Sequence, residues 1–216
     1  MKPFEKLYKE LRKKYGPPKG QWELWCKRPK TEKQREEVVI GAILTQRTNW
    51  KNVELALGNL KKAEINSLKD IYGYQPRKLG RLITPAGFYL TKAKYLLALT
   101  RFIIENYGSL KRMRKQNLGD LREELLKQKG IGPETADSIL LYALDKPVFV
   151  IDEYTRRLVK KRGLAEDLSY SFLQKLFENN LKKDFRLYQD FHALIVIDGK
   201  NKIPANRFGF GKKSEV

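Results

Sequence analysis

The stretch Lys127–Asp152, KQKGIGPETADSILLYALDKPVFVID, joins a tight glycine turn to a helix and then to a carboxylate. Glycine permits the positive φ angles and the close backbone approach that such a turn needs, and Gly130 and Gly132 supply it. Pro133 suits the first turn of a following helix. Asp152 stands where the N-cap of the next helix is expected. The stretch therefore predicts a helix, a hairpin and a second helix, with an acid behind them.

The charge balance indicates a polyanionic partner. Of the 216 residues, 45 are Lys or Arg and 25 are Asp or Glu, which gives a net charge of +20. Such a surplus favours phosphate neutralisation and counterion release. A Lys/Glu-rich thermophile surface would explain many charges but not this imbalance. No segment resembles a basic membrane-lying helix, and no apolar run reaches the roughly 18 residues that span a bilayer.

The cysteine and histidine counts exclude several cofactors. Cys26 and His192 are the one cysteine and the one histidine. A single cysteine cannot hold an iron–sulfur cluster with four thiolate ligands, and a zinc site has too few ligands. We expect no resident metal and interpret His192 as structural. With no apolar signal core at the N-terminus, we expect a cytoplasmic, nucleoid-associated prokaryotic monomer.

Helical periodicity dominates the chain and predicts an all-α fold of about ten short helices. The segment KPVFV, Lys146–Val150, is the one strand-like run, and we expect it to be extended. The segment with Trp22, Trp25 and Cys26 is expected to be a loop, as is the tail from 201 to 216. Helices are expected near 4–15, 38–44, 50–61, 65–72, 75–83, 89–107, 117–128, 133–144, 153–162, 169–179 and 185–200.

The hairpin has two interpretations. Exposed N–H groups at the start of the second helix would hold a phosphate without sequence preference. A bare Gly-x-Gly is more typical of an ordinary helical corner. Here the turn is followed by Thr135-Ala136 and by an acid 152 − 130 = 22 residues after the first glycine. This extended pattern favours the phosphate-binding interpretation.

Together with GAILTQRTNW, Gly41–Trp50, this pattern resembles the helix–hairpin–helix DNA glycosylases of the endonuclease III superfamily. The similarity covers about Glu36 to Arg162. It implies two helical lobes, one a helical barrel of residues 28–146 with the helix–hairpin–helix at about 119–144. The other joins 1–27 with 147–216. Double-stranded DNA would lie across the cleft between them, with the damaged nucleotide flipped out.

The resemblance implies two roles in the chemistry. Asp152 matches the catalytic aspartate, whose carboxylate stabilises positive charge on the sugar and orients or deprotonates water. Asp152 is also a plain N-cap candidate, and both roles are compatible. Glu134 stands where bifunctional members carry the lysine that forms a Schiff base. A carboxylate cannot do this, so we expect base release without strand cleavage, unless another lysine substitutes in space. Glu134 is also a favourable first-turn acid.

The resemblance also implies DNA contacts. Gln46 matches the glutamine that fills the hole left by the flipped base, although a surface position at the helix end is the alternative. The hairpin residues Lys129, Gly130, Ile131, Gly132 and Thr135 would contact the backbone. Further candidates for phosphate contacts, or simply solvated charges, are Lys92, Lys94, Arg112, Arg114 and Arg156. Carbonyls of the hairpin could bind a monovalent cation.

The substrate interpretation rests on the base pocket. The chain most resembles the endonuclease III-like 3-methyladenine DNA glycosylases. Three features carry this resemblance: the missing cysteine cluster, Glu134 and the N-terminal segment with tryptophans. A cationic alkylated purine is a good leaving group and suits electron-rich rings through cation–π attraction. Candidate pocket residues are Trp22, Trp25, Trp50, Glu134 and Lys200, with core packing as the alternative for the rings and a solvated tail for the lysine. Phe88 and Tyr89 are candidates for DNA contact or core.

Two alternatives to this function stay open. One is a glycosylase for uracil, mismatched thymine or oxidised bases, and the other is a non-catalytic DNA-binding module.

Overall fold

The computed structural model describes residues 2–201, and within them all regular secondary structure is helical. This confirms the all-α prediction. The helices are α1 (Pro3–Tyr15), α2 (Gln21–Trp25), α3 (Glu32–Leu44), α4 (Trp50–Lys62), α5 (Leu68–Ile71), α6 (Pro76–Leu82), η1 (Thr84–Ala86), α7 (Tyr89–Tyr107), α8 (Leu110–Met113), α9 (Leu118–Leu126), α10 (Pro133–Ser138), η2 (Ile139–Ala143), α11 (Glu153–Arg162), α12 (Tyr170–Asn180) and α13 (Phe185–Asn201).

Local sequence explains where the helices begin. The Thr31 hydroxyl accepts from the Gln34 N–H while the Gln34 side chain returns to the Thr31 N–H, a capping box at the start of α3. Asn49 and Asn117 accept hydrogen bonds from the first turns of α4 and α9. Gly108, with φ of 71°, ends α7 in the left-handed conformation that glycine adopts without penalty.

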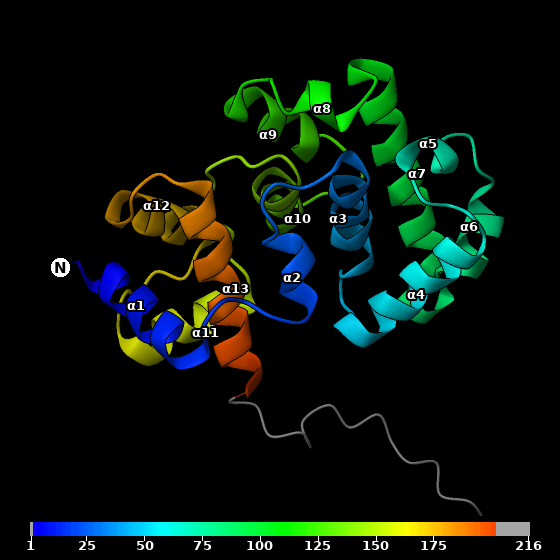
Figure 1. The fold of residues 1–216 in the computed structure, drawn as a ribbon. Coiled ribbons are helices and arrows are strands. Elements are labelled where there is room, and N and C mark those ends of the chain that lie inside the picture. Colours follow the sequence, from blue (N-terminus) through cyan, green and yellow to red (C-terminus); the bar gives the residue numbers. More distant parts are fainter. Residues whose placement is uncertain (1, 202–216) are drawn as a thin grey trace, which may run out of the picture.

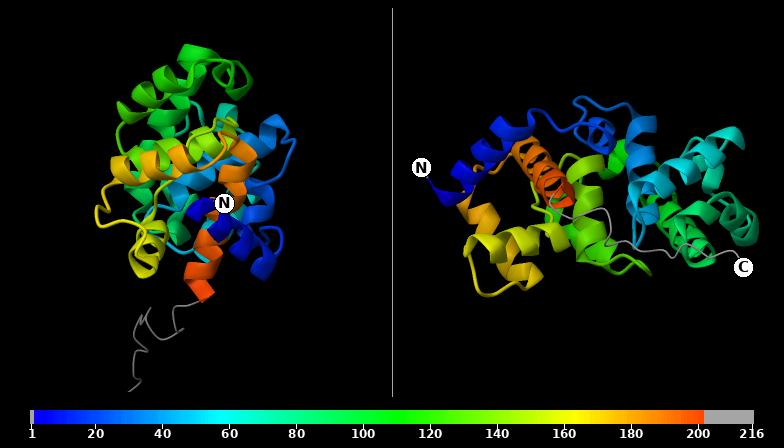
Figure 2. Two further views of the ribbon diagram at one scale, coloured as in Figure 1. Left: turned by 90° about the vertical axis from the view of Figure 1, so that its left-hand side faces the viewer. Right: turned by 90° about the horizontal axis from the view of Figure 1, so that it is seen from below.

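The helices gather at two ends of the molecule. Figures 1 and 2 show α1, α11, α12 and α13 together at one end and α3 to α8 at the other, with α10 between them. Helix α1 packs on α12 and α13, so the first and last described helices share one lobe. The proposed lobe boundaries at residues 27/28 and 146/147 stay a prediction.

One local prediction was wrong. The expected loop with Trp22 and Trp25 forms the short helix α2, because the Glu23 side chain returns to the Gly20 N–H and closes its first turn. The short elements η1 and α8 were not among the expected helices. Segment 146–152 lies outside the helices, as expected, and forms no strand pairing among the described residues. The predicted loop at 201–216 lies outside the described residues apart from Asn201, which ends α13.

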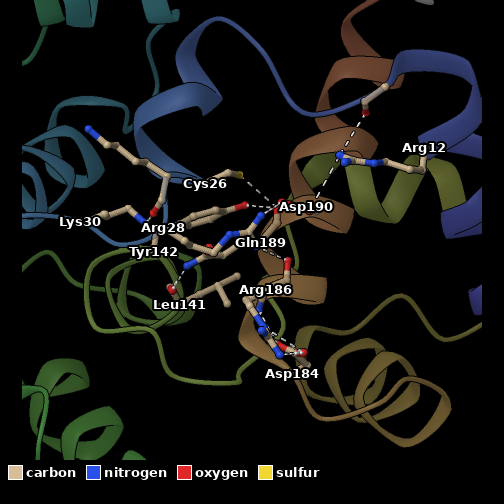
Figure 3. A network of polar contacts seen from close by, with 12 residues as sticks. Arg12, Cys26, Arg28, Lys30, Leu141, Tyr142, Asp184, Arg186, Gln189 and Asp190 are labelled. Atoms are coloured by element: carbon tan, nitrogen blue, oxygen red, sulfur yellow. Dashed lines mark hydrogen bonds and ion pairs between the residues drawn. The ribbon is translucent and has the colours of Figure 1, made fainter.

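A buried polar network fastens α13 to the helix after the hairpin, as Figure 3 shows. The Gln189 side-chain amide donates to the Leu141 carbonyl at 2.7 Å. The Gln189 carbonyl accepts from the Tyr142 hydroxyl at 3.2 Å and faces the Cys26 thiol at 3.7 Å. Arg28 pairs with Asp190 at 2.9 Å. The network therefore ties α2, η2 and α13 together behind the hairpin.

Candidate active site and DNA-binding cleft

An open cleft of about 880 Å³ runs along the hairpin. Its walls come from four parts of the chain: the end of α3, the start of α7, the hairpin with α10, and the segment around α11 and α12. The lining residues are Gln46, Arg47, Phe88, Thr91, Lys92, Tyr95, Gly130, Ile131, Gly132, Pro133, Glu134, Thr135, Arg156 and Tyr170. Four of the five predicted hairpin contacts line this cleft. The fifth, Lys129, is exposed beside it.

The two hairpin glycines are needed for different reasons. Gly130 has a φ of 83°, and an added Cβ would lie 2.2 Å from Cδ2 of Tyr95. Both the fold and the Tyr95 ring therefore require glycine at this position. Gly132 has an ordinary φ of −90°, and an added Cβ would meet no atom within 4 Å. Since the fold does not require Gly132, open space there is left for a close-approaching ligand.

Gln46 reaches across the cleft to the hairpin. Its side-chain amide donates to the Gly130 carbonyl at 2.9 Å and to the Thr135 hydroxyl at 3.1 Å. Arg47 follows with a φ of 52°, and Phe88, which also lines the cleft, has a φ of 45°. Positive φ at non-glycine residues stores backbone strain that clusters at functional sites. Phe88 is also 64% exposed, although an apolar ring is normally covered.

Asp152 caps α11 and is buried. Its Oδ1 accepts from the Thr155 N–H at 2.7 Å and the Thr155 hydroxyl at 2.9 Å, and its Oδ2 lies 3.4 Å from His192 Nε2. Burial alone raises the pKa of this carboxyl. His192 and the two Thr155 donors outweigh it, so the pKa of Asp152 lies below its usual value. A carboxylate is thereby held ionised at a helix N-terminus.

Glu134 and Lys200 both lie within electrostatic range of Asp152. Glu134 lines the cleft, and its side chain is exposed there. Partial desolvation raises the pKa of Glu134, and the charge of Asp152 raises it further. Desolvation lowers the pKa of Lys200, whose ammonium donates to the Gln21 side chain at 2.7 Å. Of these three residues, Glu134 lines the cleft, whereas Asp152 is buried and Lys200 is exposed on α13 outside the lining.

The three tryptophans form a row of edge-to-face rings. Trp22 packs on His192 with ring centroids 5.7 Å apart and on Trp25 at the same distance, and Trp25 packs on Trp50 at 6.0 Å. Trp22 and Trp25 are buried, whereas Trp50 is half-buried. The buried Trp50 Nε1 has no hydrogen-bond partner among the described residues. The row therefore extends from the partner of Asp152 to the start of α4.

The basic candidates separate into free and engaged side chains. Lys92 is not a surface charge: its ammonium donates to the Leu44 carbonyl at 2.8 Å and the Ala86 carbonyl at 2.7 Å. Burial lowers the pKa of Lys92 to about 8. Arg114 pairs with Asp145 at 3.1 Å, and the Arg156 guanidinium donates to the Leu168 carbonyl at 3.2 Å beside the cleft. Lys94 and Arg112 are exposed. Lys92 therefore borders the cleft but is buried and bonded to two carbonyls, and its role as a phosphate contact stays a prediction.

Sequence reasoning missed the side chains that support the site from remote helices. Asp137 is fully buried in α10 and accepts from Arg122 at 2.7 Å, Tyr170 at 2.8 Å and Gln174 at 2.7 Å. Gln174 also donates to the Phe149 carbonyl at 2.8 Å. The hairpin helix is thus tied to the segment that delivers Asp152. His192, interpreted as structural, lies against the Asp152 carboxylate instead.

Residues 2–201 contain no group of three or more His, Cys, Asp or Glu side chains arranged to hold a metal ion. At the hairpin, the Gln128 carbonyl accepts from Ile131 N–H at 3.1 Å and the Gly130 carbonyl accepts from Gln46. A monovalent cation would share these carbonyls, and it stays a prediction. No helix in this part of the chain is long and apolar enough to cross a membrane.

Comparisons with known protein sequences identify a family of proteins that fits the hairpin, the cleft and the acid. The profile of the HhH-GPD superfamily of base excision DNA repair proteins matches residues 40–183. The chain therefore belongs to this superfamily of DNA glycosylases. A provisionally assigned DNA repair glycosylase of Methanocaldococcus jannaschii is 50% identical over 165 residues, 75% of each chain. Endonuclease III of Thermotoga maritima is 29% identical over 158 residues, covering 72% of this chain and 70% of its own.

Comparison of structures gives the same class. A 3-methyladenine DNA glycosylase of H. pylori, solved with 1,N6-ethenoadenine, superposes with a TM-score of 0.76 and 35% identity over 94% of this chain and 100% of its own. A non-covalent endonuclease III–DNA complex superposes with a TM-score of 0.72 over 95% of this chain and 90% of its own, at 19% identity. The latter likeness shows the fold alone.

Proposed function

We propose that this DNA glycosylase hydrolytically removes alkylated purines such as 3-methyladenine and leaves an abasic site in an intact strand. The observation that carries the proposal is Glu134, a carboxylate in the cleft within electrostatic range of the ionised Asp152. A carboxylate cannot form a Schiff base with the sugar, so water is the expected nucleophile. Asp152 stabilises the cationic sugar and orients or deprotonates that water.

The substrate class is supported by the surroundings of Asp152. An alkylated purine already carries positive charge, so it leaves with little acid–base assistance and is attracted to aromatic faces. The row of Trp22, Trp25 and Trp50 begins at the histidine beside Asp152. The Lys200–Gln21 hydrogen bond joins α13 to α2 next to Trp22. The H. pylori protein with 35% identity is a glycosylase for 3-methyladenine, which supports the same lesion class here.

DNA would be held by the hairpin and the other residues that line the cleft. Main-chain N–H groups at the start of α10 would bind a phosphate, with the exposed Lys129 beside them. Gln46 and Phe88, which both line the cleft, would enter the duplex. An apolar wedge that unstacks a base step is a known way to bend duplex DNA and favour extrusion of a base. The exposure and backbone strain of Phe88 support that role.

The test uses duplex DNA treated with a methylating agent and incubated without added metal, heat or alkali. We expect free 3-methyladenine by chromatography and intact strands on a denaturing gel. Release of uracil, mismatched thymine or an oxidised base from defined duplexes, with no release of methylated purines, would reassign the lesion. Failure on every duplex, with binding retained, would favour a non-catalytic DNA-binding module.

A second arm tests whether the enzyme has lyase activity. Reduction with borohydride during the reaction traps a Schiff base as a covalent adduct, and we expect none. Lys200 is the lysine to check, because its pKa is lowered and it lies within electrostatic range of Asp152. An adduct that forms with wild type but not with Lys200→Gln would identify Lys200 as a substitute nucleophile. Lys129→Gln, which changes an exposed lysine on the hairpin, is the matched control.

A further inference from the structure

His192 contacts Oδ2 of Asp152, the carboxylate oxygen that takes no part in the helix cap. Thr155 donates twice to Oδ1, while Oδ2 faces His192 Nε2 at 3.4 Å. The Nε2 atom is buried and makes no hydrogen bond within residues 2–201; Asp152 Oδ2 at 3.4 Å is its ion-pair contact. With Asp152 ionised, the contact at this distance is attractive only if Nε2 carries a hydrogen, because a bare nitrogen lone pair would repel a carboxylate. The acid is thus the one group that can satisfy Nε2.

The other ring nitrogen, Nδ1, bonds to the Tyr142 hydroxyl, whose hydrogen can rotate between two partners. His192 Nδ1 lies 2.8 Å from the Tyr142 hydroxyl, which also lies 3.2 Å from the Gln189 carbonyl. With a neutral ring protonated on Nε2, Nδ1 accepts from Tyr142. With a ring protonated on both nitrogens, Nδ1 donates to the Tyr142 oxygen, and the hydroxyl hydrogen turns to Gln189. Both states are fully hydrogen-bonded at Nδ1, so Nε2–H can face Asp152 in either.

Asp152 is the charged group that contacts the His192 ring, and aromatic rings pack on its other sides. Trp22 of α2 and Phe149 pack edge to face on the imidazole, at 5.7 and 6.5 Å between centroids. Glu134 of α10 interacts with it through the cleft. Other titratable groups engage α13 elsewhere: Cys26 faces the Gln189 carbonyl, and from α1 Arg12 pairs with Asp190, Lys14 and Tyr15 bond Asp198, and Tyr8 packs on Phe191.

We propose that His192 is a positioning residue for Asp152, and that its Nε2–H, steered by the Tyr142 hydroxyl, keeps the carboxylate ionised and fixed in orientation. Two donors then act on Oδ1 and one on Oδ2, so the acid cannot rotate without losing a partner. The pKa of Asp152, lowered by His192 against the effect of burial, agrees with this arrangement. The consequence for catalysis rests on the function proposed above for Asp152.

The first experiment needs no substrate. Because the chain has one histidine, 15N-histidine labelling gives a single imidazole signal set. We expect a hydrogen on Nε2 in the wild type at neutral pH. In Asp152→Asn the side-chain amide can donate to Nε2, so we expect the hydrogen to move to Nδ1 while Tyr142 donates to Gln189. The same tautomer in both proteins, or a bare Nε2 in the wild type, would overturn the proposal whatever the protein's activity.

The second experiment measures the pH profile of single-turnover base excision. Excision needs ionised Asp152, whose pKa rises when its Nε2 donor is removed. In His192→Leu we therefore expect activity to be lost at a higher pH on acidification, by about one pH unit or more. His192→Gln, which keeps a donor near the Nε2 position, should restore part of the shift. An acid limb in His192→Leu that coincides with wild type would overturn the positioning role.

A matched control separates this effect from loss of packing. Phe191→Leu removes part of a fully buried ring on the same helix, where it packs on Tyr8 and Phe177 and not on Asp152. We expect it to lower the melting temperature and leave the acid limb in place. If His192→Leu does not fold, the tautomer comparison in wild type and Asp152→Asn still decides the proposal.

Discussion

At the scale of single residues, two acids that interact electrostatically have opposite pKa shifts: Asp152, which is buried, and Glu134, which lines the cleft. Asp152 accepts two hydrogen bonds from Thr155 and faces His192, which lowers its pKa. Glu134 accepts no hydrogen bond from residues 2–201, and desolvation together with the charge of Asp152 raises its pKa. Environments that separate the pKa values of neighbouring acids are typical of sites with divided roles. The lowered pKa keeps Asp152 charged at neutral pH.

The substitution Asp152→Asn separates binding from chemistry. The asparagine oxygen can still accept from Thr155 N–H, so α11 keeps its cap. Loss of the negative charge removes stabilisation of the cationic sugar and the base for water. We expect excision to fall by at least about 100-fold in single-turnover assays. Duplex affinity should equal or exceed that of wild type, because a charge near the phosphates is gone. Wild-type turnover in this variant would end the assignment of Asp152.

At this scale the sequence was informative where a residue acts within its own segment. Asp152 and Glu134 were identified because the hairpin stretch resembles that of a family of DNA glycosylases. The side chains that act across helices could not be identified, because no local pattern pairs Tyr142 with His192, 50 residues later. Lys92 shows the same limit, since its burial depends on the carbonyl of Leu44 in another helix.

At the scale of elements, the hairpin is a rigid turn with one face left open. Gly130 is locked by its positive φ and by the Tyr95 ring, and Asp137 anchors the following helix to α9 and α12. Periodicity predicted α9 and α12, which have 9 and 11 residues, and the Gly-Ile-Gly-Pro signal predicted the start of the six-residue α10. They did not predict α2, whose five residues are too few to show a period and which depends on the Glu23–Gly20 contact.

The two hairpin glycines give contrasting variants. In Gly132→Ala we expect an unchanged melting temperature, because the added Cβ meets open space at an allowed φ. Duplex affinity should fall by about tenfold, since a charge-assisted hydrogen bond to phosphate is worth about 1.5–3 kcal/mol. In Gly130→Ala the clash with Tyr95 and the positive φ should destabilise the protein by about 1–3 kcal/mol. Calorimetry and fluorescence anisotropy on undamaged duplex measure both. Wild-type affinity in Gly132→Ala would remove the hairpin from the DNA interface.

At the scale of the whole molecule, the net charge of +20 governs encounter with DNA. Composition alone indicated this partner, but it could not show that the hairpin, Phe88 and Arg156 border one cleft. That convergence depends on long-range packing, in which α13 reaches the helix behind the hairpin through Gln189. The lobe arrangement came from resemblance to a family and not from periodicity.

The charge leads to a prediction about salt. If about six phosphates are neutralised, the logarithm of duplex affinity should fall with the logarithm of salt concentration at a slope of about −5. Lys129→Gln should reduce that slope by about 1, because Lys129 is exposed at the hairpin. Titrations of undamaged duplex between low and physiological salt measure both slopes. Salt-independent binding would contradict an electrostatic interface.

The packing of α1 against α12 and α13 has a consequence for synthesis of the protein. During synthesis α1 emerges before the helices that separate it from α12 and α13. It therefore has no packing partner until those two helices have emerged. Asp152 leaves the ribosome 40 residues before His192, the side chain that faces its free oxygen. The helices of the other lobe meet their neighbours much earlier. A nascent chain would therefore display the hairpin before its acid is locked in place, and only completion of α13 would give a finished catalytic centre.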